Sequence, residues 1–107
     1  MSFRAVALGA GLLMFSHAAL ADDAATCLEG NTPEGRIGAC TSVIANSPKD
    51  LDLFDIYFAR GIAYNETEQF AKAEADLTEA ISRHPDDANA YTQRCIANTN
   101  LDKHEPA

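Results

Sequence analysis

The sequence predicts an all-α protein made of antiparallel helix–turn–helix pairs. From Ile37 to Cys95, apolar residues recur every three or four positions, which is the spacing of one helix face. Prolines and capping residues divide this pattern into segments of helical length. The motif Tyr-x-x-Arg occurs at Tyr57 and again at Tyr91, 34 residues later. A repeat of that length is typical of helical pairs that stack into a short solenoid.

Residues 1–21 are predicted to be an export signal that is removed after Ala21. Arg4 gives the segment a positive start, and an apolar run from Ala5 to Phe15 follows. The last three residues, Ala-Leu-Ala, fit the small-x-small pattern of a cleavage site. The apolar run is shorter than the about 20 residues of a membrane span, so we expect no span after cleavage.

The segment after the predicted cleavage site is polar and has no clear period. We therefore expect residues 22–32 to form an irregular N-terminal arm, with at most one helical turn around Cys27. Thr32-Pro33-Glu34 then combines a capping hydroxyl, a proline at the first helical position and an acid near the positive helix end. This combination predicts a helix that ends at about Asn46. The helical domain as a whole is predicted to occupy residues 33–107.

Three cysteines remain after cleavage. An oxidising compartment favours pairing, and Cys27 and Cys40 are close in sequence, so we predict a disulfide between them. The loop-entropy model gives such a bridge about 3 kcal/mol. Cys95 is left over and is expected to be a packed small residue. A zinc site of Cys27, Cys40 and His84 fits no usual ligand spacing, so no metal and no other cofactor is expected.

Further helices are predicted in the second half of the chain. They run from about Leu53 to Glu66, from Phe70 to His84, and onward from Ala88 after the break at Pro85. The residues expected to cap the first and the third of them are Asp50 or Asp52, and Asp86 or Asp87. One complete repeat is thus predicted at about 54–87 and an incomplete one at 88–107.

The charge of the chain limits the kinds of partner. The formal net charge is −8, and loss of Arg4 with the signal makes it −9. Nucleic acid and anionic membranes both attract clustered cations, so neither is an expected partner. Acidity of this kind keeps an exported protein soluble.

The repeat resembles the tetratricopeptide repeat (TPR). Seven positions spaced 4, 3, 9, 4, 3 and 5 residues apart agree with that family in type: Tyr57, Gly61, Tyr64, Ala73, Leu77, Ala80 and Pro85. The stretches around Cys27 and Cys40 resemble the start of short exported bacterial proteins of this kind. The resemblance implies a stack of one complete and two partial repeats, located in the periplasm or secreted.

The resemblance also implies a function. Proteins of this family bind peptides or helices in a groove lined by the first helix of each repeat. No catalytic constellation is present in the sequence, so the predicted function is a non-enzymatic module that binds another exported protein. The groove residues that the resemblance implies are Asp55, Phe58, Ile62, Asn65, Asn89, Thr92, Gln93 and Ile96.

Alternatives stay open at this point. The apolar side chains of Phe58 and Ile62 are equally well explained if the N-terminal helix covers them or if the protein associates with itself, because large exposed apolar patches are unusual on monomers. The protein as a whole is alternatively a thiol- or metal-binding protein that uses Cys95, or a truncated remnant without an independent function.

Overall fold

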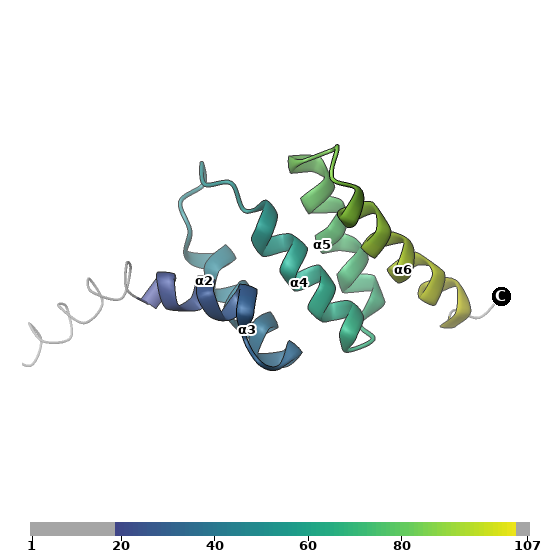
Figure 1. Cartoon of the computed structure of the whole chain (residues 1–107), viewed down its shortest axis with the longest axis horizontal. Helices are drawn as coiled ribbons and strands as arrows, with labels where there is room; N and C mark the ends of the chain where they lie inside the picture. Colours follow the sequence, from purple (N-terminus) through teal and green to yellow (C-terminus); the bar gives the residue numbers. More distant parts are fainter. Residues whose placement is uncertain (1–18, 105–107) are drawn as a thin grey trace, which may run out of the picture.

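The computed structural model describes residues 19–104, so the predicted export signal at residues 1–21 lies almost entirely outside the described residues. The described residues form five helices and no strand, in agreement with the predicted all-α class. In chain order (Figure 1) the helices are α2 (Leu20–Glu29), α3 (Pro33–Asn46), α4 (Phe54–Glu66), α5 (Phe70–Arg83) and α6 (Ala88–His104).

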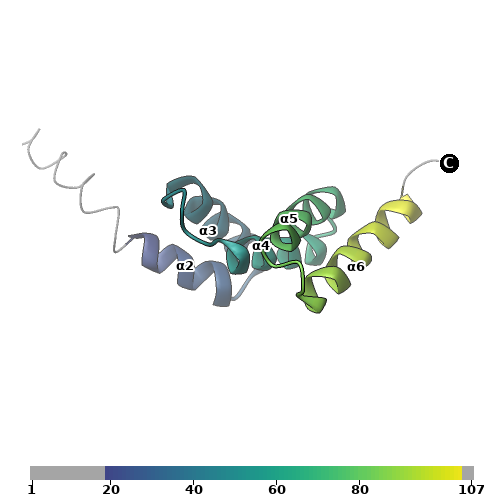
Figure 2. The ribbon, with the colours of Figure 1, turned by 90° about the horizontal axis from the view of Figure 1, so that it is seen from above.

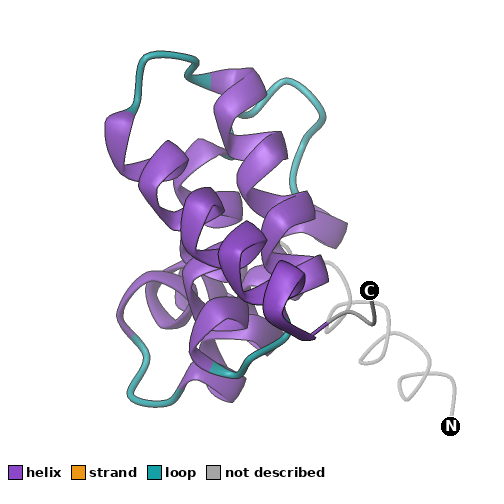
Figure 3. Cartoon of the chain, turned by 90° about the vertical axis from the view of Figure 1, so that its right-hand side faces the viewer, coloured by secondary structure: helices purple, strands orange, loops and turns teal. Residues whose placement is uncertain are grey.

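Each helix packs against the next one in the chain, and two further contacts join α2 to α4 and α4 to α6. Figure 2 shows the result: α3 and α5 lie on one side, α2 and α6 on the other, and α4 runs between them. The connecting loops lie at two opposite ends of the helices, because successive helices alternate in direction (Figure 3). Helix α4 is therefore in contact with every other helix of the described chain.

The prediction of an irregular arm at residues 22–32 is wrong. Most of this segment belongs to α2, and Gly30–Thr32 form only the short turn into α3. The polar composition concealed one apolar stripe: Cys27 is fully buried, and Leu20 and Ala24 pack against the same cluster. Tertiary packing of that stripe stabilises the helix, as it does for most helices in proteins. The described chain therefore contains two helical pairs, α2–α3 and α4–α5, followed by α6.

The predicted helix starts are confirmed by their caps. Thr32 Oγ1 accepts a hydrogen bond from the Gly35 amide at 3.0 Å. Two capping residues were candidates for each of α4 and α6, and the caps in the structure are Asp52 for α4 and Asp87 for α6. Their carboxylates accept from the amides of Phe54 and Ala90, each at 3.0 Å. Helix α6 extends to His104, beyond Asn98–Asn100, where the apolar pattern fades.

Gly61 is a point of close contact between α4 and α5. A Cβ atom at this position would lie 2.7 Å from Leu77 Cγ and 2.8 Å from Leu77 Cδ2, so only glycine fits without a shift. Leu77 is fully buried, as are Ala73 and Ala80 on the same face of α5. Small residues on both helices thus allow the close approach, and Leu77 fills the remaining space.

A charged pair joins α4 to α5 next to this contact. Arg60 donates to both oxygens of Asp76, with Nε–Oδ2 at 2.7 Å and Nη2–Oδ1 at 2.8 Å. Its third nitrogen, Nη1, donates to Thr41 Oγ1 of α3 at 3.1 Å. Asp76 is buried, and the hydrogen bonds to it raise the pKa of Arg60 above its usual value. One guanidinium therefore links three helices.

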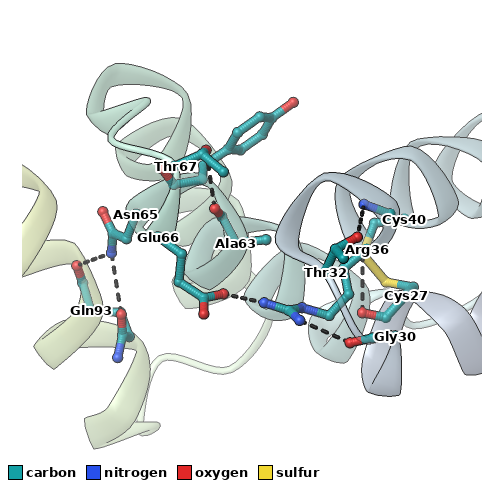
Figure 4. A network of polar contacts seen from close by, with 12 residues as sticks. Cys27, Gly30, Thr32, Arg36, Cys40, Ala63, Asn65, Glu66, Thr67 and Gln93 are labelled. Carbon is teal, nitrogen blue, oxygen red and sulfur yellow. Dashed lines mark hydrogen bonds and ion pairs between the residues drawn. A yellow bond between two sulfur atoms is a disulfide. The ribbon is translucent and has the colours of Figure 1, made fainter.

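The predicted disulfide between Cys27 and Cys40 is present and joins α2 to α3 (Figure 4). Their Cα atoms lie 4.6 Å apart, and both side chains are fully buried. The bridge and the α2 stripe around it form one core cluster with Ala39 and Val43 of α3, with Leu53 just before α4 and with Ile56 of α4.

Loss of this bridge is expected to destabilise the protein. We expect Cys27→Ala/Cys40→Ala to lower the free energy of unfolding by about 3 kcal/mol, because the unfolded chain regains the entropy of a closed loop. For a domain of this size that is a fall in Tm of roughly 12–24 °C. The measurement is a thermal melt followed by circular dichroism, with Cys95→Ala as the matched control. An equal fall in Tm for Cys95→Ala would show that the loss of stability does not come from the Cys27–Cys40 disulfide.

Candidate binding groove between α2 and α4

A cavity of about 400 Å³ lies where the start of α2 meets the start of α4. Its walls come from α2, from the end of α3, from the loop that follows α3 and from the first turn of α4. The residues that line it are Leu20, Ala21, Ala24, Leu28, Val43, Ser47, Leu51, Asp52, Leu53, Asp55 and Ile56. Most of them are apolar, which is the usual lining of a ligand pocket, and the volume is within the usual range of about 300–1,000 Å³.

A second hollow of about 360 Å³ lies towards the other end of the same two helices. It is lined by Leu28, Glu29, Gly30, Arg36, Ala59, Ile62 and Glu66. Leu28 lines both hollows and is 48 % exposed, a high value for a leucine. We call the two hollows together the α2–α4 groove.

The two ends of the α2–α4 groove differ in charge. The cavity end carries two carboxylates, Asp52 and Asp55, and the described residues that line it include no lysine or arginine. At the other end, Arg36 forms an ion pair with Glu66 and donates from Nη1 to the Gly30 carbonyl at 2.9 Å (Figure 4). Arg36 and Glu66 are therefore paired within the protein, and Glu29 is a further acidic residue of that lining.

Asp52 has a structural role at the cavity end. Besides capping α4, its Oδ2 lies 2.7 Å from Nε2 of His84, whose ring packs against Phe54 with centroids 4.3 Å apart. The hydrogen bond with His84 and the one from the Phe54 amide lower the pKa of Asp52. The side chain is ionised at neutral pH and ties the α3–α4 loop to the end of α5.

The lowered pKa predicts a dependence of stability on pH. The stabilisation by the Asp52 carboxylate is present above the unfolded pKa of 3.8 and is lost as the pH falls through the lower folded value. Asp52→Asn is thus expected to be less stable than the parent at pH 6, with a difference that shrinks as the pH falls below 3.8. Urea unfolding across this range measures the difference, with Asp86→Asn in an exposed turn as control. A difference that does not change with pH would contradict the role given to the charge.

The structure places some of the predicted groove residues in the α2–α4 groove and the others outside it. Asp55 and Ile62 line the α2–α4 groove, one in each hollow. Asn65 instead faces α6, where its amide donates to the backbone oxygen of Gln93 at 3.1 Å and to its side-chain oxygen at 3.2 Å (Figure 4). The remaining α6 residues of the set are exposed: Asn89, Thr92 and Ile96.

Phe58 occupies a packing position. It is half-buried, stacks on Phe54 with ring centroids 5.7 Å apart, and packs against two core clusters that α4, α5 and α6 share. Ile62 is half-buried and borders the N-terminal helical pair through Leu28 and Arg36. Neighbouring helices thus cover most of the Phe58 side chain and part of the Ile62 side chain.

The α2 side of the groove was absent from the predicted set. Leu20, Ala24, Cys27 and Leu28 follow helical spacing, which is a signal the sequence contained. The predicted cleavage site after Ala21 separates Leu20 from the rest of this stripe, and only Ala24, Cys27 and Leu28 lie in the segment that the sequence predicts to be an arm. Leu51 was also missed because it lies in a loop, and it is 46 % exposed.

The cysteine and histidine residues form no second site in the described part of the chain. Between residues 19 and 104, no three His, Cys, Asp or Glu side chains are placed to hold a metal ion. Cys95 is exposed, which corrects the expectation of a packed residue. It stands on a face of α6 that also carries exposed Tyr91, and no helix of the described chain covers that face.

Comparisons with protein-family models, with curated proteins and with solved structures find no match to this chain. Within the described residues, no helix is both long enough and apolar enough to cross a membrane.

Proposed function

We propose that the protein is a non-enzymatic, TPR-like interaction module of an exported compartment, and that it binds a segment of another exported protein in the α2–α4 groove. The observation that carries the proposal is the pair of hollows that share the exposed Leu28. A groove of this kind, lined by two neighbouring helices, suits an elongated ligand such as a peptide or a helix.

Two features of the chain support this proposal. The 34-residue repeat resembles a family that binds peptides, and α2, α4 and α6 are in contact in that order, as first helices of successive repeats would be. In addition, the disulfide holds α2, one wall of the groove, against α3. A wall fixed in this way is pre-organised for binding, which lowers the entropic cost of association.

The test is site-specific crosslinking in the exporting cell. A photo-crosslinking residue at Ile62 is expected to capture a defined protein partner, while the same residue at Ala75, exposed on α5, is expected to capture none. Ile62→Asp should abolish capture from a crosslinker placed at Leu28 without unfolding the protein, as checked by circular dichroism. Equal capture from Ile62 and Ala75, or unchanged capture in Ile62→Asp, would overturn the proposal.

A further inference from the structure

The inference concerns the cavity end of the α2–α4 groove and rests on the proposed function. The cavity is the larger and the more apolar of the two hollows, and its walls include aliphatic side chains from four segments of the chain. Its about 400 Å³ is enough for bulky side chains but small for a folded element. Burial of an apolar side chain of a partner here would stabilise the complex.

Export processing would enlarge this space. Leu20 and Ala21 form part of the wall, and Leu20 packs against the cluster around the disulfide. Both residues precede the predicted cleavage site, so the processed chain would lack them. The apolar surface that Leu20 covers would then be exposed in the processed protein, and an aliphatic side chain from elsewhere is the matching cover.

The charge around the cavity specifies what should accompany that side chain. Asp55 and Asp52 are exposed at its edge. Arg83 and His84 both act on the Asp52 carboxylate. Asp55 has no ion pair in the described part of the chain, and Asp22 lies in the first turn of α2, one residue beyond the cavity lining. The α-amino group created by cleavage would offset one of these charges, so the edge would remain acidic.

We infer that the cavity binds a cationic, aliphatic peptide segment of the partner, with a leucine-like side chain inside the cavity and a lysine or arginine against Asp55. An aliphatic side chain matches the walls, and a cation matches the unpaired carboxylate. An acidic segment would place a like charge against Asp55, which is unfavourable. A purely apolar segment would remove water from the Asp55 carboxylate without replacing its hydrogen bonds, which is also unfavourable.

The experiment uses the exported, oxidised protein, with its N-terminus read by mass spectrometry. The probe is a fluorescently labelled synthetic peptide of leucine and lysine, compared with its leucine and glutamate counterpart by fluorescence anisotropy. We expect the lysine peptide to bind at least tenfold more tightly than the glutamate peptide, and salt to weaken its binding.

Matched variants separate the cavity from the general negative charge of the protein. Ala24→Phe fills the cavity without changing the charge, and Asp55→Lys reverses the charge at its edge; each is expected to weaken binding at least tenfold. Their controls are Ala75→Phe and Asp86→Lys, at exposed positions away from the groove, with less than a twofold effect. Leu51→Ser provides a cavity variant outside the helices in case Ala24→Phe disturbs folding, and is expected to weaken binding severalfold.

Three results would overturn the inference. They are equal affinity for both peptides, unchanged binding in both Ala24→Phe and Leu51→Ser, or an equal effect of Asp55→Lys and Asp86→Lys. Each of them leaves the proposed function in place if Ile62 still captures a partner in the cell. If no partner is captured there, the proposed function fails whatever the peptides do.

Discussion

Leu77→Ala is expected to lower the free energy of unfolding by about 3–5 kcal/mol, because the side chain is fully buried and the helices around it cannot close the cavity completely. With a urea m-value of roughly 1 kcal/mol/M for a small domain, the unfolding midpoint should fall by about 3 M or more. Urea titration followed by circular dichroism measures this shift.

Gly61 provides the internal control for that result. Gly61→Ala alone should cost about 1–3 kcal/mol, since its Cβ would meet Leu77. In the double variant the new methyl group occupies part of the space that Leu77 leaves. The loss should therefore be smaller than the sum of the two single losses by about 1 kcal/mol. Strict additivity would show that the two residues are not in contact.

Arg60→Ala is expected to cost about 3–5 kcal/mol, because it leaves the buried Asp76 carboxylate without its partner. The same urea titration measures the loss. Glu79→Ala, which breaks the exposed Arg83–Glu79 pair at 3.2 Å, is the control and should cost less than about 1 kcal/mol.

A second variant tests the cause of the Arg60 effect. Arg60→Met/Asp76→Leu removes both charges and should recover much of the stability lost in Arg60→Ala, because no buried charge is left unpaired. If the double variant is as unstable as the single one, the loss comes from packing or from the bond to Thr41.

Four of the helices, α3 to α6, could be predicted closely from local signals in the sequence. The cap at Thr32, the acids before α4 and α6, and the proline after α5 placed helix ends within about one residue of their positions. Gly61 and Leu77, which meet in the structure, are both among the seven positions that carry the resemblance to the tetratricopeptide repeat. These features depend on a few neighbouring residues, which is why the sequence reports them well.

Helix α2 and the groove it forms could not be predicted in the same way. The stability of α2 depends on the disulfide and on packing against α3 and α4, which are contacts between segments distant in sequence. The sequence places Asp55 and Ile62 on the correct helix. It does not show that Phe58 packs between α4, α5 and α6, because those contacts also join segments distant in sequence. Local periodicity gives the face of a helix but not the neighbour that covers it.

The one-sided packing of α6 has a consequence for how the protein opens. Among the described side chains of α6, only Ala90 and Ala97 are fully buried, and Gln93 accepts hydrogen bonds from Asn65 of α4. Helix α5 instead lies between α4 and α6 and has six buried residues. Backbone amides of α6 should therefore exchange with deuterium well before those of α5, so that α6 detaches in a local opening while the disulfide-bonded pair and α4–α5 stay folded.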